Sequence, residues 1–483
     1  MGYLKEKIFQ SALVKSGSAY TIATFLLKGI SFFTIPLFTR MMTVEQYGVV
    51  NNFTAWVTIF SIFVGFNLNA AINNAYHDFR EDFRGFVKSI LKLSFLIFAG
   101  ITIITFGSIL LLGLPLSVWF AAFVLLQSYV TFIVGYFSTY LMIQNKYVLN
   151  ILVSFSSTVL NVGISVIFML TFFSEEPDLG RIVGSTLGMA ILAFPIIVYL
   201  LLQKSKAGNA NTYWKYSLKI SVPLLPHAIG GFILSQFDRI MIESYDGSHA
   251  VGLYSFVYNV ATIISVLWTA SNNAWVPWFF EKFNNKLFVE IKKNASYFAV
   301  VFSAITVTVM NITIDISRVI GPSDYQTGIA LIVPITIGYY FQFLYGFPVN
   351  LEFALKKTQF IGISTIFAAG VNVVLNVLLM PMYGYVAAAF TTTFTYFLLF
   401  IGHVILSQRL FRQTIFDFRF FTGLILIVLA YGTTLYVFVD AVILRYIMMI
   451  LIIIVLGIVL RIKIKHNLME TSLDKNDTFS QNR

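Results

Sequence analysis

The chain has 483 residues, of which 58% are hydrophobic and only 11% are charged, and its mean hydropathy is +0.83. Soluble globular proteins carry about 25% charged residues, so this composition excludes a water-soluble multi-domain enzyme and indicates a membrane protein. The net charge of +11 has to be located relative to the apolar segments before it can suggest a partner. The sequence has no cysteine, and its five histidines lack the spacing of metal ligands. We therefore expect no metal and no other cofactor.

Segments long enough to cross a bilayer recur along the whole chain. About 20 apolar residues span the hydrocarbon core as a helix, and the sequence predicts fourteen such helices. They cover residues 18–38, 49–73, 90–112, 116–140, 149–173, 181–202, 217–239, 251–275, 297–319, 327–350, 360–380, 385–407, 420–439 and 441–460. A membrane β-barrel would alternate apolar and polar residues, whereas residues 450–456 are all apolar. The predicted fold is an all-α polytopic membrane protein.

The basic residues predict the orientation of these helices. If the N-terminal segment with Lys5, Lys7 and Lys15 lies in the cytoplasm, alternation of the loops places most of the 32 Lys and Arg residues on the cytoplasmic side. This distribution is the one that the positive-inside rule describes. The positive charge is then mainly a topology signal, and nucleic-acid binding has little left to explain. We expect both termini to be cytoplasmic.

The segments between the predicted spans are short. Residues 203–216 are interpreted as a linker, and the charged, aromatic stretch 276–296 as a loop with a short surface helix. The acids Asp78, Glu81 and Asp82 are interpreted as a solvated loop face. The polar residues from 466 onward predict disorder. No loop has room for a catalytic domain, so we expect a protein that is not an enzyme, with a membrane glycosyltransferase or polymerase as the less favoured alternative.

The two halves of the chain resemble each other. With an offset of 204, residues 48–79 align with residues 252–283, and shorter matches occur at offsets of 199 and 211. Repeats of six helices have the same orientation and are related by an axis along the membrane normal. We therefore predict an N-lobe of helices 1 to 6 (1–203), a linker and C-lobe of helices 7 to 12 (204–416), two extra helices (417–465) and a cytoplasmic tail (466–483). The lobes would be pseudo-symmetric, with the substrate path between them.

One basic residue lies in the middle of a predicted span. Lys28 in the first helix would cost about 2.5–3.5 kcal/mol at the bilayer centre, and the repeat aligns it with His227. Polar residues share the lysine's face, and similar polar faces occur on predicted helices 2, 5 and 8: Ser18, Thr21, Thr24 and Ser31; Asn51, Thr54, Thr58 and Ser61; Asn150, Ser154, Ser157, Asn161 and Ser165; Tyr254, Tyr258, Thr262, Ser265, Thr269 and Asn272. These faces either line a hydrated central cavity or serve helix packing. Lys28 could equally snorkel or pair internally, and His227 could be a packing residue.

A cavity with positive potential and no acidic residue at its middle favours an anionic substrate over a cation. Lysine binds phosphate as a point charge, so a phosphate or diphosphate group is the natural candidate. Hydroxyl and amide groups on the polar faces could bind sugars by hydrogen bonds. This reasoning leaves a glycolipid and a small organic anion as alternatives.

Several segments resemble one known family. They are residues 38–48 (FTRMMTVEQYG), 237–239 (FDR), 251–254 (VGLY), 272–279 (NNAWVPWF), 372–376 (NVVLN) and 381–384 (PMYG). In combination they are similar to bacterial polysaccharide repeat-unit flippases of the O-antigen, capsule and exopolysaccharide pathways. That family belongs to the multidrug/oligosaccharidyl-lipid/polysaccharide exporter (MOP) superfamily. The chain departs from the family in having Val44, Glu45 and Gln46 where a Pro-Glu-Glu loop is usual.

The resemblance implies two six-helix lobes that alternate access and a location in the bacterial inner membrane. It implies a substrate, undecaprenyl-diphosphate-linked sugar, whose head group crosses a hydrated cavity while its polyprenyl tail stays in the lipid. Membrane lipids, a polysaccharide polymerase and glycosyltransferases are the implied partners. The candidate substrate-binding residues are Lys28, His227, Arg40, Asp238, Arg239 and Asn273. A multidrug and toxin antiporter and the lipid II flippase of peptidoglycan synthesis, both of the same superfamily, are the alternatives.

Overall fold

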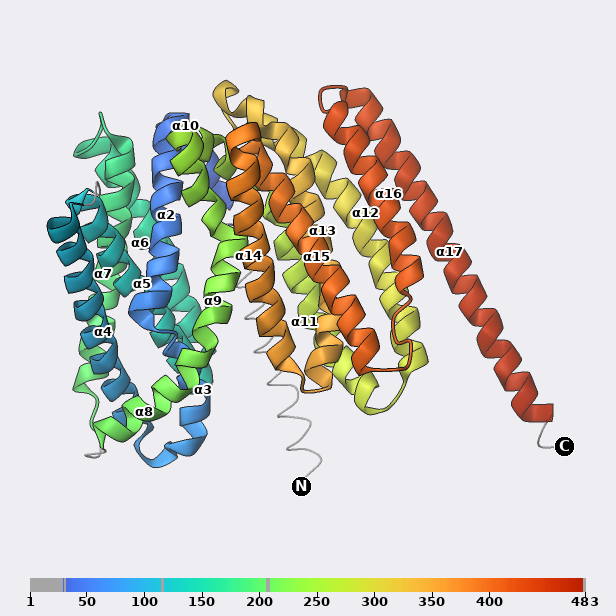
Figure 1. Ribbon diagram of the computed structural model, residues 1–483, viewed down its shortest axis with the longest axis horizontal. Helices are drawn as coiled ribbons and strands as arrows, with labels where there is room; N and C mark the ends of the chain where they lie inside the picture. The colour runs from blue at the N-terminus through green and yellow to red at the C-terminus, as the bar shows by residue number, and fades with distance from the viewer. Residues whose placement is uncertain (1–28, 30–31, 114–116, 206–208, 481–483) are drawn as a thin grey trace. The chain divides into compact units, whose positions relative to one another are not determined.

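A computed structural model describes residue 29 and residues 32–113, 117–205 and 209–480, with the backbone alone for 466–480. All regular elements in these ranges are helices (Figure 1), which confirms the predicted all-α membrane fold. They are α2 (Val44–Gly65), α3 (Asn69–Asp78), η1 (Arg80–Asp82), α4 (Phe83–Leu112), α5 (Val118–Ile143), α6 (Tyr147–Thr171), α7 (Pro177–Leu202), α8 (Ala210–Ser221), η2 (Val222–Leu224), α9 (Leu225–Phe232), η3 (Ile233–Phe237), α10 (Asp238–Ala261), α11 (Ile263–Asn284), α12 (Phe288–Ile320), η4 (Ser323–Leu331), α13 (Ile332–Ala354), α14 (Thr358–Tyr383), α15 (Val386–Leu410), α16 (Phe418–Val437) and α17 (Val442–Ser480).

The described residues contain 12 helical stretches long and apolar enough to cross a membrane. One of them, residues 210–284, includes the two predicted spans 217–239 and 251–275, because α8 to α11 follow one another almost without interruption. Each of the others corresponds to one predicted span. The first predicted span, 18–38, lies mostly outside the described residues, and helix is seen there at residues 29 and 32–41.

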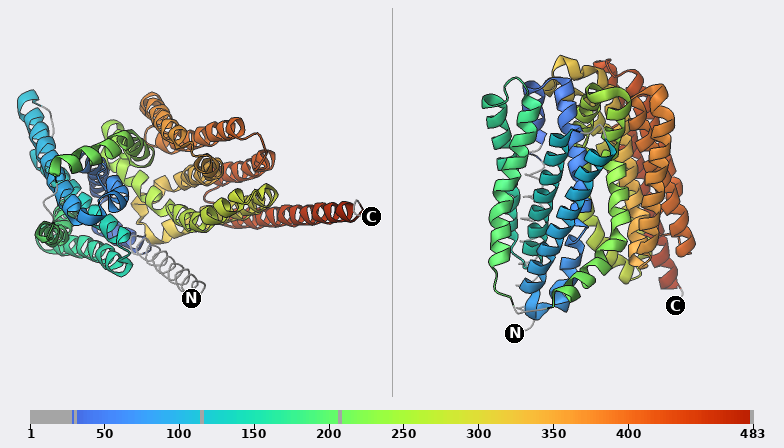
Figure 2. Two further views of the ribbon diagram at one scale, coloured as in Figure 1. Left: turned by 90° about the horizontal axis from the view of Figure 1, so that it is seen from below. Right: turned by 60° about the vertical axis from the view of Figure 1, so that its left-hand side comes forward.

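The helices pack into two compact units, residues 1–255 and residues 256–483. Within each unit, neighbouring helices run side by side along their length (Figure 2). The lobe boundary at residue 203 that the repeat suggests stays a prediction. Helix α17 extends to Ser480 and so includes most of the tail for which the sequence predicts disorder.

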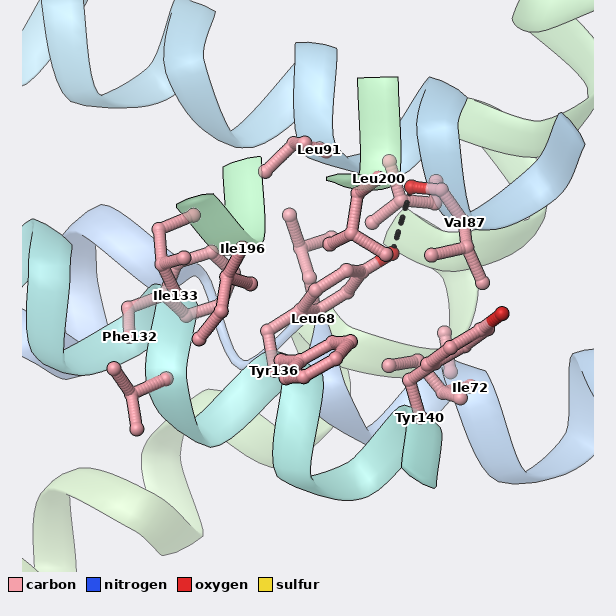
Figure 3. Close-up of a cluster of buried hydrophobic side chains, with 14 of the residues drawn as sticks. Leu68, Ile72, Val87, Leu91, Phe132, Ile133, Tyr136, Tyr140, Ile196 and Leu200 are labelled. Carbon is pink, nitrogen blue, oxygen red and sulfur yellow. Dashed lines mark hydrogen bonds between the residues drawn. The ribbon is translucent and has the colours of Figure 1, made fainter. Parts of the chain in front are cut away.

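The core of the first unit forms where α3, α4, α5 and α7 meet. Tyr136 of α5 lies at its centre among aliphatic side chains that include Ile72, Val87 and Leu200 (Figure 3). A buried phenol needs a hydrogen-bond partner, and the Tyr136 hydroxyl donates to the carbonyl oxygen of Val87 at 2.9 Å. This bond links α5 to α4 and satisfies the Tyr136 hydroxyl inside the core.

Helices α6 and α7 pack closely because small residues line their contact. A Cβ added to Gly184 would come within 2.4 Å of the Ser165 backbone, so only glycine allows this approach. Arg181 of α7 then donates to the carbonyl oxygen of Asn161 at 3.0 Å and to the Ser165 hydroxyl at 2.6 Å. Its guanidinium also lies over the ring of Phe38, 4.2 Å from the centroid. These contacts hold the end of the first helix, just before Arg40, against α7.

Helix α8 occupies part of the segment predicted as a linker. It begins after Asn209, whose side chain caps it, and it packs against α3 and α4 (Figure 1). Tyr213 donates to Asp82 at 2.9 Å and Tyr216 donates to Asp78 at 2.5 Å. Asp78 and Glu81 are exposed, as the interpretation of a solvated face predicts, whereas Asp82 is half-buried. Asp82 and Asp78 accept hydrogen bonds from tyrosines 131 and 138 residues away, which the sequence did not indicate.

The predicted loop with a surface helix at residues 276–296 is also wrong. Helix α11 continues to Asn284 and α12 starts at Phe288, so the two long helices are joined by a three-residue turn. Lys286 adopts a left-handed conformation there (φ 58°). Lys282 and Glu290 form an ion pair of 2.9 Å across the turn. The charges that suggested a loop thus belong to the ends of two spanning helices.

Aromatic side chains fill the core of the second unit. Phe302 of α12 and Phe343 of α13 stack with ring centroids 3.9 Å apart. Trp268 of α11 packs edge-on against Phe343 at 5.3 Å, and a Cβ on Gly346 would meet the Trp268 ring at 2.8 Å. Many of the 50 phenylalanines therefore pack in the protein core.

Candidate translocation surfaces

An irregular helix carries two of the predicted site residues. Between α9 and α10 the chain widens into the π-helical segment η3, a feature that is frequent at functional sites. Asp238 follows η3 directly and accepts a hydrogen bond from the Tyr254 hydroxyl at 2.7 Å. Arg239 donates to the carbonyl oxygen of Ser235 at 3.2 Å. Both charged side chains are buried, with 2% and 3% of their surface exposed.

Hydrophobic packing holds this irregular helix against α2. Ala55 of α2 is buried with Phe232 and Ile240, and Trp56 and Phe237 cover them. The start of α2 is set by a capping box, in which Thr43 and Gln46 exchange hydrogen bonds through their side chains and backbone. The departure of this chain from the Pro-Glu-Glu pattern therefore keeps a well-formed helix start.

The predicted polar face of α2 is present and accessible. Thr58 and Ser61 are half-buried, and Thr54 is exposed. Each hydroxyl donates to a carbonyl oxygen of α2 three or four residues earlier: Thr54 to Val50, Thr58 to Thr54 and Ser61 to Thr58. Such bonds satisfy the donor inside the helix and leave the hydroxyl oxygen able to accept. The face can therefore bind water or sugar hydroxyls.

Helix α11 of the second unit repeats this arrangement. Thr262 and Ser265 align with Thr58 and Ser61 at the offset of 204. Ser265 donates to the carbonyl oxygen of Thr262 at 2.8 Å, as Ser61 donates to Thr58 at 2.7 Å. Thr262, the N-cap residue of α11, and Ser265 are both half-buried. The repeat-equivalent serines thus share one hydrogen-bond geometry, while Thr262 donates to Asn259, three residues earlier, and Thr58 to Thr54, four residues earlier.

The predicted binding residues fall into three groups. Lys28 lies outside the described residues. Arg40 and His227 in the first unit and Asn273 in the second are exposed. Asp238 and Arg239 are buried, so within the first unit they stabilise α10 and η3 and are not at the surface. The assignment of these residues to substrate binding stays a prediction.

A buried polar network in the second unit was not recognised as a site in the sequence. Asn372 of α14 donates to the Thr392 hydroxyl of α15 at 3.1 Å. Asn376 donates to Asn372 at 3.3 Å and accepts from Thr391. The spacing of Asn372 and Asn376, one helical turn apart, was the available signal. The network joins α14 to α15 inside the unit.

The sequence analysis also missed a buried pair of titratable side chains, His403 and Glu352. His403 Nδ1 of α15 lies 2.8 Å from Glu352 Oε1 of α13, and both side chains are at most 1% exposed. Tyr345 stacks on the imidazole with centroids 5.8 Å apart. The predicted span ended at residue 350, whereas α13 runs to Ala354 and so carries Glu352 into the helix packing.

Two arginines near helix ends in the second unit form ion pairs. Arg445 of α17 is fully buried and binds Asp315 of α12, which also accepts from the Tyr446 hydroxyl at 2.6 Å. Arg318 pairs with Asp440 at 2.6 Å. These bonds tie α17 and the preceding turn to α12. Among the described residues, no group of three His, Asp or Glu side chains is placed to hold a metal ion.

Solved structures with similar folds are membrane transporters. The lipid II flippase MurJ, in an inward closed conformation, superposes with a TM-score of 0.66 at 17% identity, covering 91% of this chain and 98% of that one. A multidrug resistance MATE family transporter of the MOP superfamily, in an outward-facing conformation, gives 0.55 at 13% identity, covering 83% and 96%. The chain therefore shares the fold of these multi-pass membrane transporters.

Sequence comparison gives the family. Residues 13–283 match the sequence model of the family described as "Polysaccharide biosynthesis protein", and the chain belongs to this family. Two proteins of Haemophilus influenzae are each 24% identical: an "Uncharacterized membrane protein" over 281 residues and "Lsg locus putative protein 1" over 299 residues. The matches cover 56% and 59% of this chain, and they span 66% and 68% of the lengths of these relatives.

Proposed function

We propose that the protein is a flippase that moves undecaprenyl-diphosphate-linked oligosaccharide repeat units from the cytoplasmic to the periplasmic or outer leaflet of the bacterial inner membrane. Two lobes would alternate access to the two sides, and both termini would lie in the cytoplasm. The family, the fold shared with a lipid II flippase and the relative from the Lsg locus support this proposal. A polymerase and glycosyltransferases are the proposed partners, and catalysis is not part of the proposal.

The observation that carries the proposal is the pair of accessible polar faces on α2 and α11. Polar side chains within a membrane span usually face the interior of the helix bundle or a water-filled cavity, so a row of half-exposed hydroxyls favours a hydrated surface. Because each hydroxyl already donates within its helix, its oxygen offers an acceptor to a passing sugar. Weak, repeated acceptors suit a path through which a bulky sugar must move.

The diphosphate would be held mainly by basic side chains, with one side-chain amide. Lys28 is the proposed central contact, with Arg40, His227 and Asn273 as further contacts at exposed positions. Asp238 and Arg239 would act indirectly, because they are buried at the start of α10, directly after η3. A Lys ammonium attracts phosphate without directional demands, which permits release after reorientation.

Surface polysaccharide in a strain without its own flippase tests the role of Lys28. Lys28→Ala should lower polymer at the surface at least tenfold at equal protein level, and Lys28→Arg should partly restore it. Arg409→Ala is the matched control. It removes an exposed positive charge that lies on α15, and the variant should behave as wild type. Normal polymer with Lys28→Ala would overturn the role of this residue.

The polar faces can be tested separately. Thr58→Val and Thr262→Val together keep side-chain volume and remove two acceptors, so we expect transport to fall severalfold with unchanged protein level. Thr102→Val is the matched control, because Thr102 makes the same bond to its own helix on α4. Equal transport in both variants would contradict the proposal that these faces line the path.

The lipid II flippase is the second candidate, and the TM-score of 0.66 to MurJ favours it over a drug antiporter. A lipid II flippase should rescue the growth of cells depleted of their own lipid II flippase. A repeat-unit flippase should instead restore only surface polysaccharide, in a strain that lacks its own repeat-unit flippase. Drug resistance conferred by the protein would point to the antiporter and against both flippases.

A further inference from the structure

A basic stripe runs along the first part of α4. Arg84, Lys88 and Lys92 are spaced four residues apart, so they share one face of the helix. Arg84 and Lys92 are exposed and Lys88 is half-buried. The same face continues with Phe95 and Ile103, which are 57% and 73% exposed. A cationic end followed by an exposed apolar face matches the two parts of an anionic lipid.

The cations of this stripe have no ion-pair partner among the described residues. Lys282 and Lys463, by contrast, pair with Glu290 and Asp417 at 2.9 Å. Asp78 and Asp82 lie next to the start of α4, and they accept hydrogen bonds from the tyrosines of α8. Because no described acid forms an ion pair with these three cations, their positive charge can attract an external anion.

Helix α8 lies beside the stripe. The indole of Trp214 donates to the carbonyl oxygen of Ser89 at 3.0 Å, which places α8 at the level of Lys88. Lys215 and Lys219, one helical turn apart, are exposed on α8, and Figure 1 shows the helix crossing at the end where α4 begins. Aromatic and basic residues on a short helix of this kind are typical of the membrane interface.

We propose that Arg84, Lys88 and Lys92 bind the head group of an anionic phospholipid in the leaflet where α4 begins. The phosphate would lie against the three cations and the acyl chains along Phe95 and Ile103. Positive-inside topology explains why cations occur at this end. It does not explain why three of them lie on one face, with no ion-pair partner in the described part of the chain, directly in line with exposed apolar side chains. The stripe belongs to α4, whereas the polar faces of the proposed transport path belong to α2 and α11.

Each cation near an anionic lipid surface contributes about fivefold to affinity. The full chain, purified in detergent, can be titrated with phosphatidylglycerol and with phosphatidylcholine while native mass spectrometry counts the bound lipids. For the triple variant R84Q/K88Q/K92Q we expect at least about tenfold weaker binding of phosphatidylglycerol and unchanged binding of phosphatidylcholine. The triple variant R84K/K88R/K92R should bind as wild type does.

The matched control is R409Q/R412Q/R419Q, which removes three exposed charges from the second unit and should keep binding. Equal loss in this control, or no loss in the α4 variant, would overturn the site. Preferential binding of undecaprenyl diphosphate over phosphatidylglycerol at the stripe would overturn it too, because the stripe would then serve the transported substrate. If the triple variant does not fold, Lys92→Gln alone, at an exposed position, should still weaken binding severalfold. None of these readouts depends on polysaccharide transport.

Discussion

Gly48 of α2 and Gly252 of α10 face each other in reciprocal contact. A Cβ on Gly48 would lie 1.8 Å from the carbonyl oxygen of Ser248, and a Cβ on Gly252 would lie 2.0 Å from that of Val44. At the offset of 204, Gly48 aligns with Gly252 and Val44 aligns with Ser248. Each glycine therefore packs against the residue that precedes its own repeat equivalent by one helical turn. This symmetry inside the first unit supports the internal repeat inferred from the sequence.

Gly48→Ala should destabilise the protein strongly. The new methyl group would collide with backbone, which cannot move aside as a side chain can, and overpacking of this kind costs about 1–3 kcal/mol. We expect a lower thermal midpoint for the purified protein in detergent, and a similar loss for Gly252→Ala.

Gly107→Ala provides the control for that experiment. Gly107 lies in α4 with nothing within 4 Å of an added Cβ, so alanine should raise helix stability by about 0.5–1 kcal/mol. A thermal midpoint for Gly48→Ala as high as that of Gly107→Ala would show that α2 and α10 do not touch at this glycine.

Removing the hydroxyls of Tyr213 and Tyr216 should release α8. A hydrogen bond to a charged group is worth about 1.5–3 kcal/mol, and Tyr213→Phe with Tyr216→Phe removes two of them while the rings stay packed on Phe79. We expect faster hydrogen exchange and earlier proteolysis in residues 203–221. Tyr383→Phe, on an exposed side chain, is the control. Unchanged protection of α8 would mean that its ring packing suffices.

The buried pair of His403 and Glu352 should behave as a unit. Loss of one partner of a buried pair costs about 3–5 kcal/mol, whereas replacing both with apolar residues of similar volume can be neutral. His403→Leu should therefore destabilise the protein more than the double variant His403→Leu with Glu352→Met. A thermal-melting cycle of the two single variants and the double variant measures this coupling. Additive losses would show that the two groups stabilise the fold independently.

The sequence predicted the spanning helices well because lipid imposes a length and a composition on each of them. The predicted span 251–275 overlaps α11, and its polar face is found at Thr262 and Ser265. The errors occurred where tertiary contacts compete with local pattern. Residues 276–296 looked like a loop because charges such as Lys282 and Lys286 occur there, but Lys282 forms an ion pair with Glu290 between two continuous helices.

The candidate site was harder to predict. Periodicity gives the face on which a side chain lies, but not whether another helix covers it. Asp238 and Arg239 were chosen from a resemblance, and they are buried by packing of α2 on η3 that no local pattern encodes. His403 and Glu352 are 51 residues apart, so their pairing depends on how α13 meets α15.

Asp417 is the N-cap of α16. Its carboxylate accepts from the backbone N–H of Phe420 at 3.2 Å and from Lys463 of α17 at 2.9 Å. Burial alone would raise the pKa of this carboxyl, but the hydrogen bonds from Lys463 and Phe420 outweigh burial and lower the pKa below its ordinary value. The unfolded carboxyl titrates near about 3.9, so the unfolded chain binds the proton more tightly than the folded protein does.

The stability contributed by Asp417 is therefore complete above about pH 4 and is lost as the pH falls through the lower folded pKa. We expect Asp417→Asn to weaken the acid-induced fall of the thermal midpoint, since asparagine still caps the helix but cannot titrate. Asp417→Ala should also lose about 1 kcal/mol at neutral pH, because the cap is gone. Glu175→Gln, on an exposed acid, should change neither. An acid-induced fall that is identical in wild type and Asp417→Asn would show that Lys463 does not hold the charged carboxylate in the folded protein.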